Sequence, residues 1–498
     1  MNVNPITRLD YPDPDVIRVE DTYYMVSTTM HFMPGCEILQ SFDLVHWEHA
    51  TYVYETLDHT DAQQLKSGQN IYGQGMWAAS LRYHEGRFYI CFVANDTRKT
   101  YLYTSEKIDG PWKKQLIEGF YHDGSLLFDE DGRNYIVYGN DEIWITELNE
   151  DLTAPKKDGL HRLLVSDHKN PELGYEGSHI QKINGYYYIF LIHSQRDRWM
   201  RTEACFYSDS LEGEFTGGDV LCDDRGYCGQ GVAQGGIVDT PDGKWYAILF
   251  QDSGAVGRIP ILVPVTWKDH FPVFGQNGHV PEEIEVHSTR PGYIYQPLVG
   301  SDDFCNGLLP RWQFNHDPDP RYYHLDALQG TYTITTREVC TELTQAVNTL
   351  TQRMSYPSCA AEVTVDASAL KEGDVAGLCA LQSCYAAVGI TKHHGKYEVL
   401  MLDKKEDGIL DMTEGTVVES HQMDFRLEAD FCNMKDEARC YYRVNKGDWL
   451  PIGTVHKLYF KLDHFTGCRF GLFCYAAEET GGSACFRDFK YYDVDEIS

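Results

Sequence analysis

The feature that most constrains the fold is a segment that recurs five times in the first half of the chain. Each copy has a polar turn, a tyrosine and an apolar run, and the copies read VEDTYYMVST, HEGRFYICFV, DEDGRNYIVYG, INGYYYIFLI and TPDGKWYAILF. Their tyrosines are Tyr24, Tyr89, Tyr135, Tyr188 and Tyr246, with gaps of 65, 46, 53 and 58 residues. Such spacing is typical of one four-stranded blade per repeat. Because a single blade cannot bury both faces, five copies predict a five-bladed β-propeller in which neighbouring blades stack.

Equivalent positions in the five repeats hold residues of unusual character. Counting twelve residues back from each tyrosine, or eleven from Tyr24 where the turn is one residue shorter, gives Asp13, Trp77, Asp123, Glu176 and Gln234. In a propeller these positions converge on one end of the central axis. Three carboxylates gathered there repel one another unless one is protonated or paired, and such arrangements are typical of catalytic sites. A calcium site in the channel, or simple solvation of the acids, is the alternative.

Composition narrows the choice of partners. The net charge of −32 argues against nucleic acid and anionic membrane, which both require a basic surface, so we expect a neutral substrate. The opening MNVNPITRLDYPDPDVIR has neither a basic nor an apolar signal region, and apolar runs long enough to span a membrane are absent, which favours a cytoplasmic protein. The 15 cysteines follow no metal or redox spacing, so we expect free thiols.

The pattern changes near Leu298. A loop-rich stretch with several prolines is followed by alternating strands such as GTYTITTR, CAAEVTVDA, KLYFKLD and RFGLFCYA, separated by Gly and Asp turns. This pattern predicts a β-sandwich. We therefore divide the all-β chain into a propeller, residues 1–297, and a C-terminal β-sandwich, residues 298–498.

Two carboxylates with different pKa values are what glycoside hydrolysis requires, since one must donate a proton to the leaving oxygen while the other activates water or attacks carbon. A third carboxylate near the acid raises its pKa and orients it. A GxSxG nucleophile motif and a phosphate-binding loop with its lysine are not evident in the chain. The glycine-rich GQGVAQGG lies inside a β-repeat, where a phosphate-loop interpretation is weak.

Three segments resemble blocks of glycoside hydrolase family 43, whose members are five-bladed propeller enzymes that release arabinose or xylose. They are YPDPDVIRVEDTYYMVSTT, HDGSLLFDEDG and YEGSHIQKINGYYYIF. The resemblance implies that Asp13 is the general base, Asp123 the residue that tunes the pKa of the acid, and Glu176 the general acid. The same three residues emerge from the repeat count. Asp-Gly-Ser and Gly-Ser-His replace the family's Asp-Pro-Ser and Gly-Pro-His, and neither change removes a catalytic group.

Further blocks imply substrate-binding residues. GMWAASLRYHEG places Trp77 in the sugar pocket, MHFMPGCEILQSFDLVHWE makes Phe32 a pocket wall, and GRIPILVPVTWKDHFPVFG makes Arg258 a contact to substrate hydroxyls, with a structural salt bridge as the alternative. Gln234 stands where many members have a channel histidine that helps order water or calcium. The resemblance implies that no redox or organic cofactor is required, while a structural calcium ion remains possible.

The C-terminal region resembles the concanavalin-like jelly-roll domain of one subset of the family. In relatives that domain packs on the propeller and sometimes lends a loop to the pocket rim. We expect any such rim contact near His316, with its neighbours Asn315 and Asp317. A purely stabilising role, or separate carbohydrate binding, is the alternative.

The resulting hypothesis is an exo-acting, inverting hydrolase of pentose-containing oligosaccharides derived from arabinoxylan, xylan or arabinan. It would release terminal α-L-arabinofuranose or β-D-xylose, and the resemblance to the subset with this C-terminal domain implies an α-L-arabinofuranosidase with some β-xylosidase activity. Inversion predicts that the carboxyl groups of Asp13 and Glu176 lie roughly 6.5–9.5 Å apart. A non-catalytic carbohydrate-binding propeller and a phosphorylase on the same scaffold are the alternatives. The sequence leaves the oligomeric state open.

Overall fold

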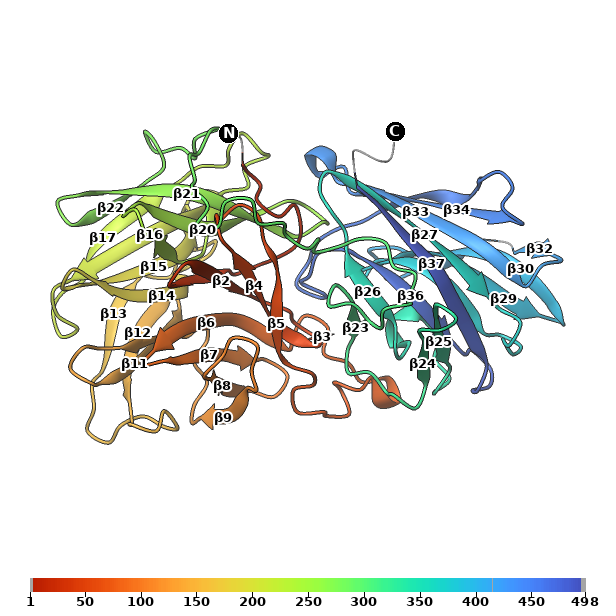
Figure 1. Ribbon diagram of the computed structural model, residues 1–498, viewed down its shortest axis with the longest axis horizontal. Coiled ribbons are helices and arrows are strands. Elements are labelled where there is room, and N and C mark those ends of the chain that lie inside the picture. Colours follow the sequence, from red (N-terminus) through yellow and green to blue (C-terminus); the bar gives the residue numbers. More distant parts are fainter. Residues whose placement is uncertain (1–2, 414, 494–498) are drawn as a thin grey trace.

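The computed structural model describes residues 3–413 and 415–493 and consists of two β-rich bodies side by side (Figure 1). Helical structure in the described residues is confined to three single-turn 3-10 segments, η1 (Lys66–Gly68), η2 (Leu343–Gln345) and η3 (Cys432–Met434). No helix in the described part of the chain is long and apolar enough to cross a membrane. All 15 cysteines lie in this part and all are free thiols, as expected.

The N-terminal body is the predicted five-bladed propeller, and every strand pair within its blades is antiparallel. Blade 1 comprises β1 (Asp15–Val19), β2 (Thr22–Ser27), β4 (Gly35–Ser41) and β5 (Glu48–Tyr54); blade 2 comprises β6 (Met76–His84), β7 (Arg87–Ala94), β8 (Lys99–Ser105) and β9 (Lys113–Ile117); blade 3 comprises β10 (Ser125–Phe128), β11 (Asn134–Asn140), β12 (Glu142–Leu148) and β13 (His161–Ser166). Blade 4 comprises β14 (Glu176–Ile183), β15 (Tyr186–Ser194), β16 (Arg201–Ser208) and β17 (Thr216–Leu221), and blade 5 comprises β18 (Val232–Ala233), β19 (Ile237–Asp239), β20 (Trp245–Asp252), β21 (Arg258–Lys268) and β22 (Phe271–Phe274).

The propeller is held together by apolar contacts between successive blades. Five clusters of buried side chains join blade 1 to 2, 2 to 3, 3 to 4, 4 to 5, and 5 back to 1. The segment before β1 also hydrogen-bonds to blade 5, from Ile6 N to the Pro260 carbonyl and from Tyr11 N to the Arg258 carbonyl. These contacts explain the repeat physically, because each strand buries apolar side chains against the next blade and none is self-sufficient.

The C-terminal body is the predicted β-sandwich, with one large apolar core between two antiparallel sheets. The first sheet contains β23 (Gln313–Asn315), β26 (Leu350–Arg353), β28 (Val375–Leu381), β29 (Ala386–His393), β30 (Lys396–Lys404), β31 (Leu410–Met412), β32 (Thr416–Val418) and β36 (Arg469–Tyr475). The second contains β24 (Tyr323–Asp326), β25 (Thr331–Thr335), β27 (Ser358–Asp366), β33 (Gln422–Asp430), β34 (Glu437–Val444), β35 (Leu450–Lys457) and β37 (Ser483–Asp493).

The two bodies share backbone pairing as well as side-chain contacts. Strand β3 (Phe32–Met33), which leaves blade 1, pairs with β23 and so becomes the edge strand of the first sandwich sheet. The buried Arg353 guanidinium pairs with Glu37 at 2.8 Å across the boundary. Asp10 accepts hydrogen bonds from the backbone of Arg258 at 2.7 Å and of Gly467 at 2.8 Å, so it fixes a sandwich loop against blade 5. The sandwich is therefore positioned by the propeller.

Candidate active site

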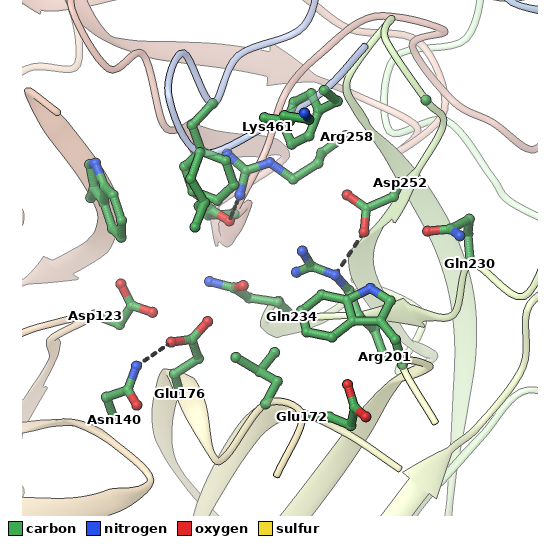
Figure 2. Close-up of a pocket in the computed structure, with 18 of the residues that line it drawn as sticks. Asp123, Asn140, Glu172, Glu176, Arg201, Gln230, Gln234, Asp252, Arg258 and Lys461 are labelled. Carbon is green, nitrogen blue, oxygen red and sulfur yellow. Dashed lines mark hydrogen bonds and ion pairs between the residues drawn. The ribbon is translucent and has the colours of Figure 1, made fainter. Parts of the chain in front are cut away.

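One cavity of about 580 Å³ opens at the end of the propeller where the five repeat-equivalent positions converge. It is lined by Asp13, Trp77, Asp123, Glu176 and Gln234, and also by Arg258. The structure thus brings together the five repeat-equivalent residues and Arg258. Figure 2 shows Asp123, Glu176, Gln234 and Arg258 facing this common space.

In blades 1, 3, 4 and 5 the backbone near the start of the innermost strand contains a residue with a left-handed conformation. Asp13, Asp123 and Gln234 have φ angles of 52°, 47° and 60°, in the left-handed region that non-glycine residues rarely adopt. In blade 4 the corresponding irregularity falls on Gly177, with φ of 64°, where an added Cβ would lie 2.7 Å from the Gln234 side chain. Backbone strain of this kind persists only where the surrounding structure enforces it, and it gathers at functional sites.

Two hydrogen-bond donors hold the side chain of Asp13 in place. Arg258 donates from Nη1 to Oδ1 at 2.8 Å, and the Thr28 hydroxyl donates to Oδ2 at 2.6 Å. The side chains of Arg258 and Asp13 are only 3% and 8% exposed. Charge-assisted hydrogen bonds in a buried setting fix the orientation of a carboxyl group, so Asp13 is positioned to accept a proton from water. Arg258 therefore forms the salt bridge considered as the alternative to a substrate contact, and it lines the cavity as well.

Glu176 and Asp123 are linked through His122. Asn140 donates from Nδ2 to Glu176 Oε2 at 2.7 Å, and His122 Nε2 lies 3.4 Å from the same oxygen and 3.6 Å from Asp123 Oδ2. The Gly177 amide donates to Asp123 Oδ2 at 3.0 Å. The side chain of Glu176 is 19% exposed and that of Asp123 only 6%, so Glu176 is the more accessible of the two carboxyl groups.

Burial raises the pKa of Asp123 to about 6, and the nearby charges of Glu176 and Asp13 act in the same direction while His122 opposes them. The Asp123 carboxylate in turn raises the pKa of His122 to about 9. At neutral pH the imidazole is consequently a cation set between two carboxyl groups. The cluster holds a proton on a carboxyl group to higher pH than an isolated aspartate does, which suits acid catalysis near neutrality.

His122, Asp123 and Glu176 also present ligand atoms within 4.8 Å of one another, which is close enough for them to share a metal ion. Calcium takes about six to eight oxygen ligands, whereas this group offers two carboxyl groups and one imidazole. The imidazole carries a proton at neutral pH, and Asn140 and Gly177 already donate to the carboxyl groups. The group does not fit calcium, and the structural calcium that the resemblance leaves open has no further support among the described residues.

The sandwich contributes part of the cavity wall, which the sequence did not locate. The loop between β35 and β36 brings Phe460, Lys461, Leu462 and Phe465 to the cavity. The Phe465 ring lies 5.5 Å from that of Trp77 and 4.4 Å beneath the Arg258 guanidinium carbon. A sandwich loop does therefore reach the pocket, but it comes from residues 460–465 and not from the segment around His316.

Two sequence-based expectations are wrong in position. Phe32 does not line the cavity, because pairing of β3 with β23 draws it into the sandwich core, where its fully buried ring lies 3.5 Å from the Arg469 guanidinium carbon. His316 is fully buried between the bodies and accepts a hydrogen bond from Ile71 N at 3.0 Å. Its neighbours are also engaged, since Asn315 donates to Tyr72 Oη and Asp317 pairs with His59.

Two protein-family models match the chain. Glycosyl hydrolases family 43 matches residues 3–272, which contain all five blades apart from the end of β22. The β-xylosidase C-terminal concanavalin A-like domain matches residues 301–492, which contain the sandwich. Both matches agree with the architecture seen in the structure.

Individual proteins show the same likeness. The chain is 26% identical to a β-xylosidase of Formosa agariphila over 99% of its own length and 89% of the relative's. It is 24% identical to a non-reducing end α-L-arabinofuranosidase of Bacteroides ovatus over 82% of its length and 79% of the relative's. Among solved structures, a bifunctional GH43-CE protein of Bacteroides eggerthii superposes with a TM-score of 0.92 at 42% identity. That match covers 99% of this chain and 64% of the other, so the chain spans about two thirds of that protein.

Proposed function

Since the chain belongs to glycosyl hydrolases family 43, we propose that it is an exo-acting, inverting hydrolase that releases terminal pentoses from oligosaccharides. The observation that carries this proposal is the division of labour among the three carboxyl groups. Arg258 and Thr28 fix the Asp13 carboxyl group by hydrogen bonds, whereas Glu176 lies beside a protonated cluster at the accessible side of the cavity. An inverting hydrolase needs one base and one acid of this kind.

In the proposed reaction, Asp13 removes a proton from a water molecule as that water attacks the anomeric carbon. Glu176 protonates the oxygen of the departing sugar as the glycosidic bond breaks. Asp123 and the His122 cation keep a proton within the cluster and hold Glu176 in place through the contact at 3.4 Å. After departure of the products, Asp13 carries the extra proton and Glu176 has lost one, so exchange with solvent restores the starting state.

The proposed substrate is a neutral oligosaccharide that ends in α-L-arabinofuranose or β-D-xylopyranose. Support comes from the relatives, one of which is a β-xylosidase and another an α-L-arabinofuranosidase. The cavity volume of about 580 Å³ suits one or two sugar units better than a long polymer segment. Walls from both bodies, including Trp77 and Phe465, close the pocket in the manner expected for removal of a chain end.

The proposal is tested by following hydrolysis of 4-nitrophenyl β-D-xylopyranoside and 4-nitrophenyl α-L-arabinofuranoside by proton NMR. We expect turnover of at least one pentoside, with the inverted anomer as the first product. Release of the retained anomer would overturn the assignment of Asp13 as a base. A lack of turnover of both pentosides and of xylo- and arabino-oligosaccharides would overturn the proposed function itself, while a rate that requires phosphate would indicate a phosphorylase.

A further inference from the structure

A second group of residues, which the proposed chemistry does not use, lies at the other end of the cavity. It comprises Arg201, at the start of β16, Asp252, at the end of β20, and Trp199, in the loop before β16. Figure 2 shows Glu176 and Gln234 between Asp123 on one side and Arg201 on the other. The cavity therefore has a reacting end and a second end beyond the proposed acid.

Arg201 is fixed, but its hydrogen-bonding capacity is not used up. Its side chain is 10% exposed, and its Nε pairs with Asp252 Oδ2 at 2.7 Å. The guanidinium carbon lies 5.1 Å from the ring centre of Phe250 and 5.4 Å from that of Trp199. Among the described residues, none accepts a hydrogen bond from Nη1 or Nη2, and Figure 2 shows this end of the side chain directed into the cavity. A nearly buried guanidinium with free donors is costly unless a ligand or water satisfies them.

Trp199 supplies a flat apolar surface beside these donors. It is 47% exposed although it lines the cavity, which is unusual for so large an aromatic side chain. An exposed indole next to polar donors is the combination by which proteins bind amphipathic rings, since the ring face contacts the indole and the hydroxyl groups meet the donors.

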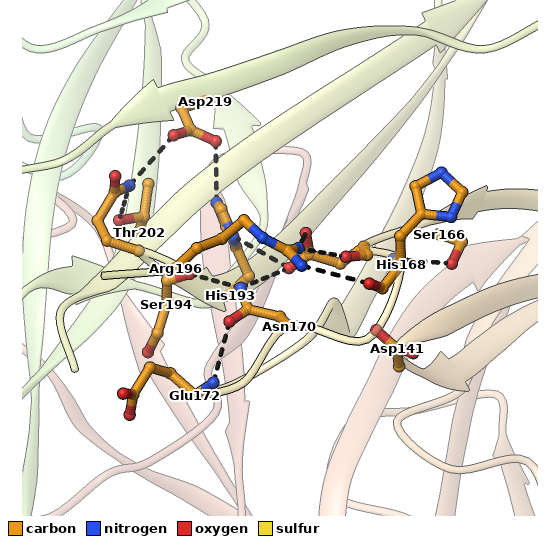
Figure 3. Close-up of polar contacts among 12 residues, drawn as sticks. Asp141, Ser166, His168, Asn170, Glu172, His193, Ser194, Arg196, Thr202 and Asp219 are labelled. Carbon is orange, nitrogen blue, oxygen red and sulfur yellow. Dashed lines mark hydrogen bonds and ion pairs between the residues drawn. The ribbon is translucent and has the colours of Figure 1, made fainter. Parts of the chain in front are cut away.

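The loop that carries Trp199 is tied to the neighbouring rim loop (Figure 3). Arg196 Nη1 donates to the Asp167 carbonyl at 2.5 Å, and Asn170 Nδ2 donates to the Ser194 carbonyl at 2.8 Å. The second loop brings Leu173 to the cavity. These bonds hold the rim in place before any ligand arrives, which reduces the entropic cost of binding.

Charge indicates what kind of ligand fits. The cavity is lined by five acidic side chains, Asp13, Asp123, Glu172, Glu176 and Asp252, and by the basic residues Arg201, Arg258, Lys461 and His122. Arg201 is already neutralised by Asp252, and Arg258 by Asp13. An anionic sugar would therefore gain little from Arg201 and would be repelled by the remaining acids, so a neutral sugar is favoured.

We propose that Trp199 and Arg201 form the subsite for the sugar unit from which the terminal pentose is cleaved. A neutral pyranose would stack on Trp199 and accept hydrogen bonds from the free Nη groups of Arg201. Its position beyond Glu176 places the glycosidic oxygen next to the proposed acid. This inference rests on the proposed function, and it adds which residues select the leaving group.

The test compares two substrates that carry the pentose preferred by the wild type: an oligosaccharide, whose leaving group is a sugar, and the pentosyl fluoride, whose leaving group is too small to reach the subsite. We expect kcat/KM of Trp199→Ala and Arg201→Met to fall roughly 10- to 100-fold on the oligosaccharide, since aromatic contact and charged hydrogen bonds contribute on that order. On the fluoride it should change less than about 3-fold. Arg201→Lys, which keeps a positively charged donor group but not the planar guanidinium, should recover part of the loss. Trp449→Ala, in the β34–β35 turn of the sandwich, is the matched control and should leave both rates unchanged.

The outcomes separate the two claims. If the wild type hydrolyses neither substrate, the proposed function fails. If the wild type is active and Trp199→Ala lowers both rates equally, or lowers neither, the subsite assignment is overturned. Trp199 is exposed at the rim, so its replacement should preserve the fold, and a melting curve checks this directly. A stronger loss on an oligosaccharide with a uronic acid leaving group than on the neutral one would overturn the choice of a neutral ligand.

Discussion

Histidines in two regions of this molecule differ in charge because their surroundings differ. His122 in the active-site cluster lies beside Asp123 and Glu176, and the Asp123 carboxylate raises its pKa to about 9. Between the two bodies, His31, His316 and His464 form a second group, here called the interdomain histidine cluster. Burial lowers the pKa of His31 and His316 well below the ordinary value and that of His464 to about 3.

The interdomain histidine cluster is packed as an aromatic group. The His31 ring centre lies 4.8 Å from that of His316 and 5.1 Å from that of His464, and the Tyr72 ring contacts all three. The rings also oppose one another's protonation, and Arg469 does the same to His31 and His464, while Asn315 acts in the other direction on His31. Burial alone does not decide the charge of a histidine here, because the sign follows from whether the nearest charged groups are carboxylates or cations.

The largest expected effect comes from breaking the active-site cluster. Glu176→Gln should lower kcat on an oligosaccharide roughly 100- to 10,000-fold, because a positioned general acid contributes about that much. The loss should be smaller on a 4-nitrophenyl glycoside, whose leaving group needs little protonation. Steady-state rates on both substrates measure the difference. Glu172→Gln, a rim carboxylate of the same cavity, is the control and should retain most activity. Equal losses on both substrates would show that Glu176 does not act as the acid.

The next largest effect is expected on the pH dependence of folding stability, to which the interdomain histidine cluster contributes. A histidine whose folded pKa lies below its unfolded value near 6.5 stays neutral in the native state, so stability is lost as pH falls below 6.5. At one pH unit below that value each ring costs about 1.4 kcal/mol of unfolding free energy. We therefore expect the melting temperature of His464→Leu, relative to that of the wild type, to be higher at pH 5.5 than at pH 7.5. Both ring nitrogens of His464 lack a hydrogen-bond partner among the described residues, so leucine removes no such bond.

His324→Leu is the matched control for this experiment, because His324 is exposed on β24. Its replacement should leave the pH dependence of melting unchanged. If the melting temperature of His464→Leu changed with pH in the same way as that of the wild type, the assignment of a neutral buried imidazole would be contradicted.

The sequence alone located those site residues whose positions follow from the repeat itself. Counting from the repeat tyrosines located Asp13, Asp123 and Glu176 because each lies at the start of the innermost strand of its blade or two residues before it, and the innermost strands meet at the axis. The sandwich was likewise predictable from alternating strands. Local pattern carries no information on which body a short strand joins, so Phe32 was expected in the pocket although β3 pairs with the sandwich.

Residues that reach the cavity from loops were missed for the same reason. Phe465 and Trp199 lie outside the repeat, and their positions depend on how the sandwich docks and how the rim loops are tied together. Arg201 starts the third strand of its blade, whereas the repeat count reached only the innermost strands. In the sequence, the signal for this part of the cavity was a tryptophan, Trp199, followed two residues later by an arginine.

The smallest effect concerns the charge that distinguishes the two regions. In His122→Gln the cation that favours ionised Asp123 is gone, so the pKa of that carboxyl, about 6 in the wild type, should rise. The alkaline limb of the pH profile of kcat/KM, which reports loss of the proton from the free enzyme's cluster, should move upward by about one pH unit.

The control is His84→Gln, at a residue that lines the opposite mouth of the propeller, and it should leave the limb in place. A limb that stays fixed or moves to lower pH in His122→Gln would mean that His122 is not a cation beside Asp123. The two groups of histidines would then share one charge state, and the distinction drawn between the two regions would not hold.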